Sequence, residues 1–124
     1  MHEQLSLLDL VAPAAIIRPV DPDGHVVQGE PDEEIAWSGR GVKTLLQIHQ
    51  HTDGLWMWSV SFETSETGVH YRVGPKWGRF ATTRRDAVTL AMQELRERVD
   101  ESQQIAPAQK TALISWAARM EAQA

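Results

Sequence analysis

The chain has 124 residues, the length of one small domain, and it contains no cysteine, which excludes disulfides, thiolate zinc sites and cysteine nucleophiles. No apolar run approaches the roughly 20 residues that cross a bilayer, and early acidic residues argue against a secretory signal, so a cytoplasmic protein without membrane contact is predicted. The net charge of -5 is uneven, because residues 1–34 hold eight acids and one base, whereas residues 35–124 hold nine acids and eleven bases.

The first 34 residues are predicted to be an acidic, largely flexible leader. They contain four prolines and two glycines, and "RPVDPDG" and "GEPDEE" are typical of turns and solvated loops. Their apolar residues lack a long period, although a short strand is predicted near "AIIRPV". A single folded domain is predicted over residues 35–124.

The folded domain is predicted to begin with strands. A short strand at "EIAW" and a turn at "SGRG" precede strands over residues 42–51, 55–63 and 69–73, in which apolar side chains alternate. The Asp-Gly of "TDG" suits a hairpin turn between the first two of these. Together they predict an antiparallel β-meander of three or four strands.

Two helices are predicted to follow the strands. Thr83 is expected to cap the first helix with Asp86 as an approximate capping box, and Pro107 suits the first turn of the second. Apolar residues recur at helical spacing in both segments: Val88, Ala91, Met92, Leu95 and Val99, then Leu113, Trp116, Ala117 and Met120. The predicted fold class is α+β, with the meander packed on one face by one or two C-terminal helices.

This architecture leaves the second face of the sheet uncovered. The side chains expected there are largely polar: Gln47, His49, His51, Ser59, Ser61, His70 and Arg72. An open face of this kind is a candidate surface for a partner. A homodimer through this face or through the last helix is a further hypothesis, with Trp116 and Met120 as anchors.

The leader begins with a leucine-rich peptide, "HEQLSLLDL". Within it, "QLSLL" resembles the bacterial sliding-clamp-binding motif, although Leu8 stands where that motif prefers phenylalanine. The resemblance implies that Gln4, Leu5, Leu7 and Leu8 bind an apolar cleft of a DNA sliding clamp, as a peptide that becomes ordered on binding. Docking of these leucines on the protein itself, or in a homodimer, is the alternative.

A second candidate lies in the basic stretch over residues 70–85, which contains no acid. Its candidate nucleic-acid-binding residues are Arg72, Lys76, Trp77, Arg79, Arg84 and Arg85. Cations beside an aromatic ring suit phosphate contact and base stacking, and two of these arginines begin a helix, where cations need a further reason to be present. The triplet "WGR" also resembles that of WGR domains, which bind DNA ends. A solvated charged loop is the alternative.

No residues of the sequence predict a catalytic or metal site. His49 and His51 could bind a metal together with His70 or Asp53, but histidines on an exposed sheet face are far more common than metal ligands. No glycine elbow or phosphate-binding loop is present. No enzyme activity and no cofactor are therefore predicted.

The sequence favours a small non-enzymatic accessory or adaptor protein. It is predicted to bind a protein partner from the DNA-replication, defence or mobile-element machinery, including plasmid and phage systems, through its leader or its open sheet face. An inhibitor of such a machine is one form of this hypothesis. The alternative function is DNA or RNA binding through residues 70–85.

Overall fold

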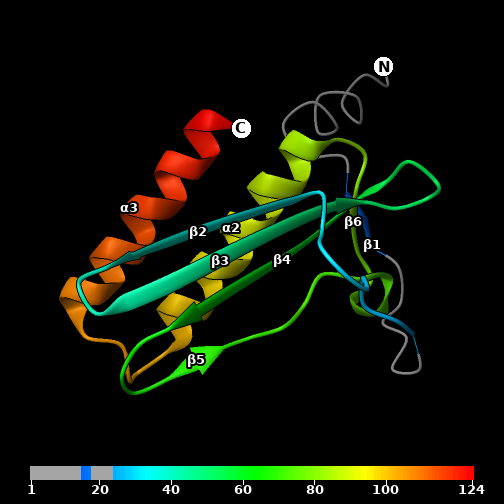
Figure 1. The fold of residues 1–124 in the computed structure, drawn as a ribbon. Helices are drawn as coiled ribbons and strands as arrows, with labels where there is room; N and C mark the ends of the chain where they lie inside the picture. The colour runs from blue at the N-terminus through cyan, green and yellow to red at the C-terminus, as the bar shows by residue number, and fades with distance from the viewer. Residues whose placement is uncertain (1–14, 18–23) are drawn as a thin grey trace.

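The computed structural model describes residues 15–17 and 24–124, and it consists of a sheet with two helices on one face (Figure 1). The strands are β1 (Ala15–Ile17), β2 (Glu33–Gly39), β3 (Val42–Gln50), β4 (Trp56–Glu63), β5 (Gly68–Val69) and β6 (Arg79–Ala81). The helices are the 3-10 helix η1 (Pro75–Trp77), α2 (Arg84–Glu101) and α3 (Pro107–Gln123). The described strands form a six-stranded antiparallel sheet in the order β1-β6-β4-β3-β2, and β5 pairs with β4 on the same edge as β6.

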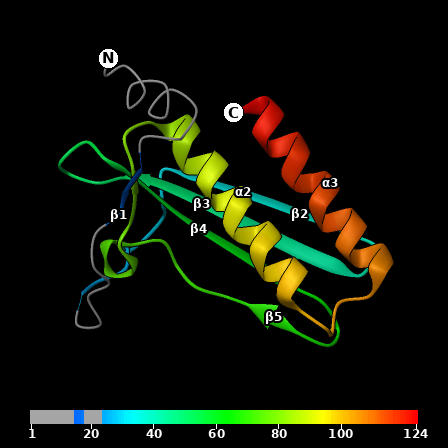
Figure 2. The same ribbon diagram turned by 180° about the vertical axis from the view of Figure 1, so that it is seen from behind.

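Helices α2 and α3 lie side by side across the same face of the sheet, as Figure 2 shows from behind. Helix α2 packs on β4 and β3, and α3 contacts β3 and α2. The predicted α+β class, with an antiparallel meander covered on one face by C-terminal helices, is confirmed.

The turn between β2 and β3 consists of two residues with left-handed backbone. Arg40 has a φ of 54° and Gly41 a φ of 79°, and the flanking residues Gly39 and Val42 face each other in the register. Positive φ at both central residues is the geometry of a tight hairpin turn that matches the twist of the strands. The turn predicted at "SGRG" is therefore confirmed.

The core lies between the helices and the nearer face of the sheet. The apolar stripes predicted on the two helices are buried, and they pack against Leu46, Ile48, Trp58, Val60 and Phe62. Burial of this apolar surface is the main stabilising contribution to such a fold. At the start of α2, the Thr83 hydroxyl accepts a hydrogen bond from the backbone N–H of Asp86, as the capping pattern predicts.

The strand predicted over residues 69–73 is wrong beyond Val69, where β5 ends. After that point the chain bonds to side chains of the sheet instead of to the backbone of β4. The N–H of Tyr71 donates to Ser61 Oγ at 3.3 Å, and the N–H of Val73 donates to Gln47 Oε1 at 3.0 Å. The strand pattern of "VHYRV" did not identify these partners, because they lie far away in sequence.

The prediction that the second sheet face is open is wrong for its central residues. Gln47, Ser59 and Ser61 are buried, since the segment around Val73 lies over them. Their side chains satisfy one another and the backbone that covers them, as buried polar groups must. The remaining exposed part of this face lies at β2 and the start of β3.

Part of the predicted leader packs against the body. The N–H of Val27 donates to the carbonyl of Val73 at 2.8 Å, and the N–H of Lys76 donates to the carbonyl of His25 at 3.0 Å. Strand β1, which lies where a short strand is predicted, pairs with β6. The ordered body thus includes residues before the predicted boundary at residue 35.

Candidate functional site

The predicted basic surface over residues 70–85 is partly neutralised by the protein's own acids. Arg79 Nε lies 2.7 Å from Glu94 Oε1, and the Arg84 guanidinium makes two hydrogen bonds to the carboxylate of Glu33, at 2.5 and 2.7 Å. The hydrogen bond from Arg84 lowers the pKa of Glu33 below its usual value, and that from Glu33 raises the pKa of Arg84. Both arginines have an acidic partner that explains their presence without a ligand.

Trp77 and its two neighbouring cations are held at the edge of the sheet. The indole N–H of Trp77 donates to the carbonyl of Arg72 at 2.7 Å, and its ring meets that of Tyr71 edge-on. Arg72 Nε donates to the carbonyl of Val27 at 2.6 Å, and the ammonium of Lys76 lies 5.1 Å from the Trp77 ring centroid. Arg85 alone among the six predicted residues is exposed and without an ion pair or side-chain hydrogen bond to any described residue.

Glu94 organises the polar contacts between α2 and the sheet. Its carboxylate accepts hydrogen bonds from Tyr71 Oη at 2.7 Å and Trp58 Nε1 at 3.2 Å, in addition to Arg79. Burial is the main cause that raises the pKa of Tyr71, and the nearby Glu94 carboxylate adds to it. These contacts fix α2 to β4, to β6 and to the segment after β5, which is a structural role.

The histidines are paired separately with acids. His49 Nδ1 lies 3.6 Å from Asp32 Oδ2, and His51 Nδ1 lies 3.1 Å from Asp53 Oδ1. The third histidine, His70, lies 3.2 Å from Glu63 Oε1. Among the residues that the structure describes, no three histidine or acidic side chains converge as a metal site would require.

Two further predicted surfaces have different outcomes. Gln4, Leu5, Leu7 and Leu8 lie outside the described residues. The proposed dimer anchors Trp116 and Met120 are buried in the core, 3% and 8% exposed, so the prediction that they meet a second copy is wrong. Their helical spacing belongs to the buried stripe of α3. The sequence alone does not distinguish such a stripe from an interface with a second copy.

Strand β2 lies at one edge of the sheet that the structure describes. No strand among the described residues pairs with its outer side. An edge strand directs every second N–H and C=O away from its partner, and it is commonly protected by lysine, proline or a bulge. Residues 35–39, "IAWSG", contain neither lysine nor proline. This edge is therefore able to accept another strand.

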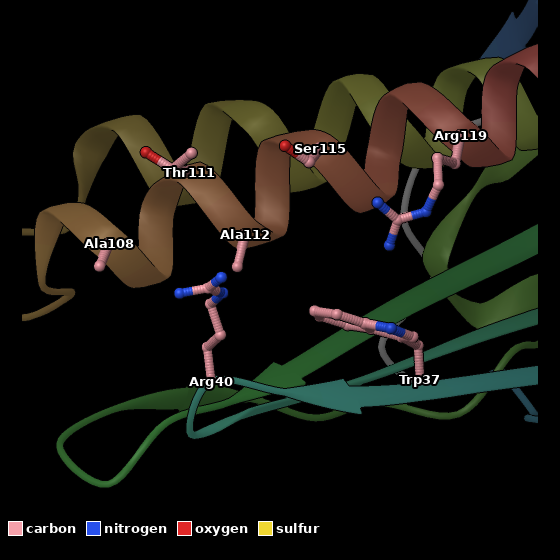
Figure 3. A pocket seen from close by; sticks show the side chains of 7 residues that line it. All are labelled: Trp37, Arg40, Ala108, Thr111, Ala112, Ser115 and Arg119. Carbon is pink, nitrogen blue, oxygen red and sulfur yellow. The ribbon is translucent and has the colours of Figure 1, made fainter.

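A groove runs beside this edge, between α3 and the β2–β3 turn (Figure 3). In Figure 3, Arg40 extends from the turn towards α3, and Arg119 extends from α3 towards Trp37. The Arg119 guanidinium carbon lies 5.6 Å from the Trp37 ring centroid. The lining residues are Trp37, Arg40, Ala108, Thr111, Ala112, Ser115 and Arg119.

The groove is cationic because neither of its arginines is paired with an acid among the described residues. Arg40 and Arg119 are exposed, and neither makes an ion pair with a described residue. No acidic side chain lines the groove. The arrangement can bind a carboxylate or another anion between two guanidinium groups, beside a half-buried indole.

Sequence reasoning missed this groove, although it carried a partial signal. The eleven bases of residues 35–124 include several outside the stretch over residues 70–85. The arginine of "SGRG" occupies a turn position at which asparagine or glycine is usual. What could not be predicted is that a turn near residue 40 and a helix near residue 119 form one groove.

Comparison of this chain with protein-family models, with curated proteins and with solved structures finds no match. Within the described residues, no helix is long and apolar enough to span a membrane. The function is accordingly inferred from the geometry of this chain itself.

Proposed function

We propose that this protein is a small, non-enzymatic, cytoplasmic accessory or adaptor protein that binds a protein partner of the DNA-replication, defence or mobile-element machinery. The observation that supports binding best is the edge of β2, with which no described strand pairs on its outer side, and the cationic groove beside it. An exposed strand edge is a ready site for an extended peptide of another protein. The resemblance of "QLSLL" to the clamp-binding motif supports a sliding clamp as one partner.

Protein binding has more support than the alternative, DNA or RNA binding through residues 70–85. Nucleic-acid affinity depends on cations that are available to replace the counterions of phosphates. Arg79 and Arg84 are already paired with Glu94 and Glu33, and the indole N–H of Trp77 is already bonded. Arg72, Lys76 and Arg85 remain as phosphate contacts in that alternative.

The test is co-purification of the tagged full-length chain from a bacterial host, with three matched variants. Leu5→Ala with Leu7→Ala removes the leader anchors, Ala36→Pro removes an outward N–H of β2, and Leu10→Ala is a control in the leader. The adaptor proposal expects a protein that the wild type and the control retain and one test variant loses. A retained sliding clamp, repeated with the purified clamp, would identify the partner.

Two results would contradict the proposal. The first is that no protein is enriched over a tag-only sample. The second is that every retained protein is held equally by both test variants. A gel shift of the full chain with duplex DNA at about 50 mM salt, abolished by neutralising Arg72, Lys76 and Arg85, would instead support the nucleic-acid alternative.

A further inference from the structure

We propose that the partner of β2 is an acidic, extended peptide segment, which adds to the sheet as a strand and places a carboxylate between Arg40 and Arg119. This inference rests on the proposed binding function and deepens it by naming the chemistry of the segment. It is carried by three features of the molecule: the register of β2, the hollows on both sides of it, and the charge of the groove.

The register of the hairpin identifies the backbone groups that a new strand would meet. Residues alternate along an antiparallel pair between those bonded to the partner strand and those directed away from it. The pair Gly39 and Val42 closes a two-residue turn and is a bonded pair in such hairpins. The N–H and C=O groups of Ala36 and Ser38 therefore point outward.

The edge of β2 is flanked by a hollow on each face of the sheet. The groove lies on the helical face beside Trp37, whose ring stacks on Trp116 of α3. A second hollow lies on the opposite face, lined among others by Ala36, Ser38 and Leu45. Side chains of an added strand alternate between the two faces, so one set would enter the groove and the other set the second hollow.

Charge selects the chemistry of the segment. Arg40 and Arg119 enter the groove, and Lys43 lines the second hollow. None of the three makes an ion pair with a described residue, and both hollows lack an acidic lining residue. Acidic side chains are thus complementary to both faces, and they match guanidinium groups with two parallel hydrogen bonds.

The conformation of Arg40 supports a binding role for its side chain. Arg40 is the one non-glycine residue with positive φ in the described part of the chain. This conformation favours glycine or asparagine, so an arginine there costs stability. A guanidinium that gains a partner on binding gives this residue a reason to occupy the turn.

A second copy of this chain fits the edge less well than a foreign segment. Self-pairing of β2 would supply Glu33 and Glu34 as the acidic groups. Glu33 is already bonded to Arg84, and Glu34 Oε2 already accepts from Gln47 Nε2 at 2.8 Å. Nucleic acid fits less well again, because it lacks the alternating N–H and C=O groups that a strand edge pairs with.

The experiment is a titration of the ¹⁵N-labelled full-length chain with a synthetic peptide in which valine and glutamate alternate. A peptide with glutamine at each glutamate position is the matched control, and a short single-stranded oligonucleotide is a third ligand. The proposal expects the glutamate peptide to shift and protect the amides of Ala36 and Ser38 and to shift residues 108–119. The glutamine peptide is expected to bind more weakly.

Separate variants test the two arginines of the groove and the strand pairing at β2. Arg40→Asn keeps the turn. Both Arg40→Asn and Arg119→Ala are expected to weaken binding of the glutamate peptide about three- to fivefold. Ala36→Pro is expected to abolish strand pairing, whereas Ala36→Val, which keeps the N–H, is not. Proline is tolerated at an edge position whose N–H faces solvent. Cooperative unfolding of each variant is the check that it folds.

Four outcomes would overturn the inference. The first is that the glutamate and glutamine peptides bind equally, and the second is that neither arginine variant changes peptide binding. The third is that the oligonucleotide shifts the amide signals and the peptide does not. The fourth is that, without peptide, the amides of β2 become protected as the protein concentration rises. If the co-purified partner is lost with Ala36→Pro while the glutamate peptide does not bind, the binding function stands and the acidic segment is wrong.

Discussion

The carboxylate of Glu94 holds the guanidinium of Arg79 at 2.7 Å, although the two residues lie 15 positions apart. The same carboxylate accepts from Tyr71 and Trp58, so it joins α2 to β4, to β6 and to the segment after β5. The Glu94 side chain is 14% exposed. A carboxylate in this position is satisfied only if all of these elements are in place.

Glu94→Ala should therefore reduce the free energy of unfolding by about 2–4 kcal/mol, because it leaves the phenol, the indole N–H and the guanidinium without their acceptor. The measurement is urea unfolding followed by tryptophan fluorescence. Glu97→Ala is the control, since Glu97 is exposed on the same helix, and it should change stability by less than about 0.5 kcal/mol. Equal effects of the two variants would contradict the structural role of Glu94.

Tyr71 is the single tyrosine of the chain, so its titration can be followed by tyrosinate absorbance. Burial, and then the Glu94 carboxylate, raise the pKa of Tyr71 above its usual 10.0. The unfolded chain loses this proton first, so stability should fall as the pH rises above that value. Glu94→Gln should lower the titration midpoint, and an unchanged midpoint would show that burial alone raises the pKa.

Arg40→Gly should increase the free energy of unfolding by about 0.5–1 kcal/mol, since glycine accepts the φ of 54° without a steric cost. Gly41→Ala is the opposite case. Its φ is 79°, and an added Cβ would lie 3.0 Å from Gln109 Nε2, so it should destabilise by at least about 1 kcal/mol. Thermal unfolding of both variants checks the pair, and a destabilised Arg40→Gly would argue against strain at the turn.

The ion pair of Glu33 and Arg84 should make stability depend on acidic pH. The hydrogen bond from Arg84 lowers the pKa of Glu33 from its usual 4.5. Its contribution is present above that value and is lost as the pH falls through the lower pKa of the folded state. Because both side chains are about one-third exposed, the contribution should be about 1 kcal/mol or less.

Glu33→Gln is the variant that measures this contribution, by urea unfolding from about pH 6 to about pH 3. The wild type should lose more stability over this range than the variant does. Parallel pH profiles of the two proteins would show that the ion pair adds nothing measurable in solution.

Local patterns predicted the elements that depend on neighbouring residues. The strands β3 and β4, the cap at Thr83 and the buried stripes of α2 and α3 are confirmed by the structure. The strand predicted after Val69 did not hold, because Tyr71 and Val73 bond to Ser61 and Gln47. Those contacts span 10 and 26 residues, beyond what a periodic pattern reports.

The same distinction applies to the surfaces. The basic stretch was visible in the sequence, but its two ion pairs were not, since Arg84 finds Glu33 across 51 residues. The Trp116 stripe is equally suited in the sequence to a core or to an interface, and only its burial in the folded chain assigns it to the core. Residue types indicate what each candidate surface could bind, but they do not indicate whether its side chains are free to bind it.

The sequence by itself determined the α+β class, the helix starts, the hairpin turns and the uneven charge, because each follows from residues close together in the chain. Only the tertiary structure decided which cations are neutralised, which sheet face is covered, and that Arg40 and Arg119 share a groove beside the edge of β2. Burial and ion pairing depend on distance in space, and chain folding brings together residues whose separation in sequence carries no signal.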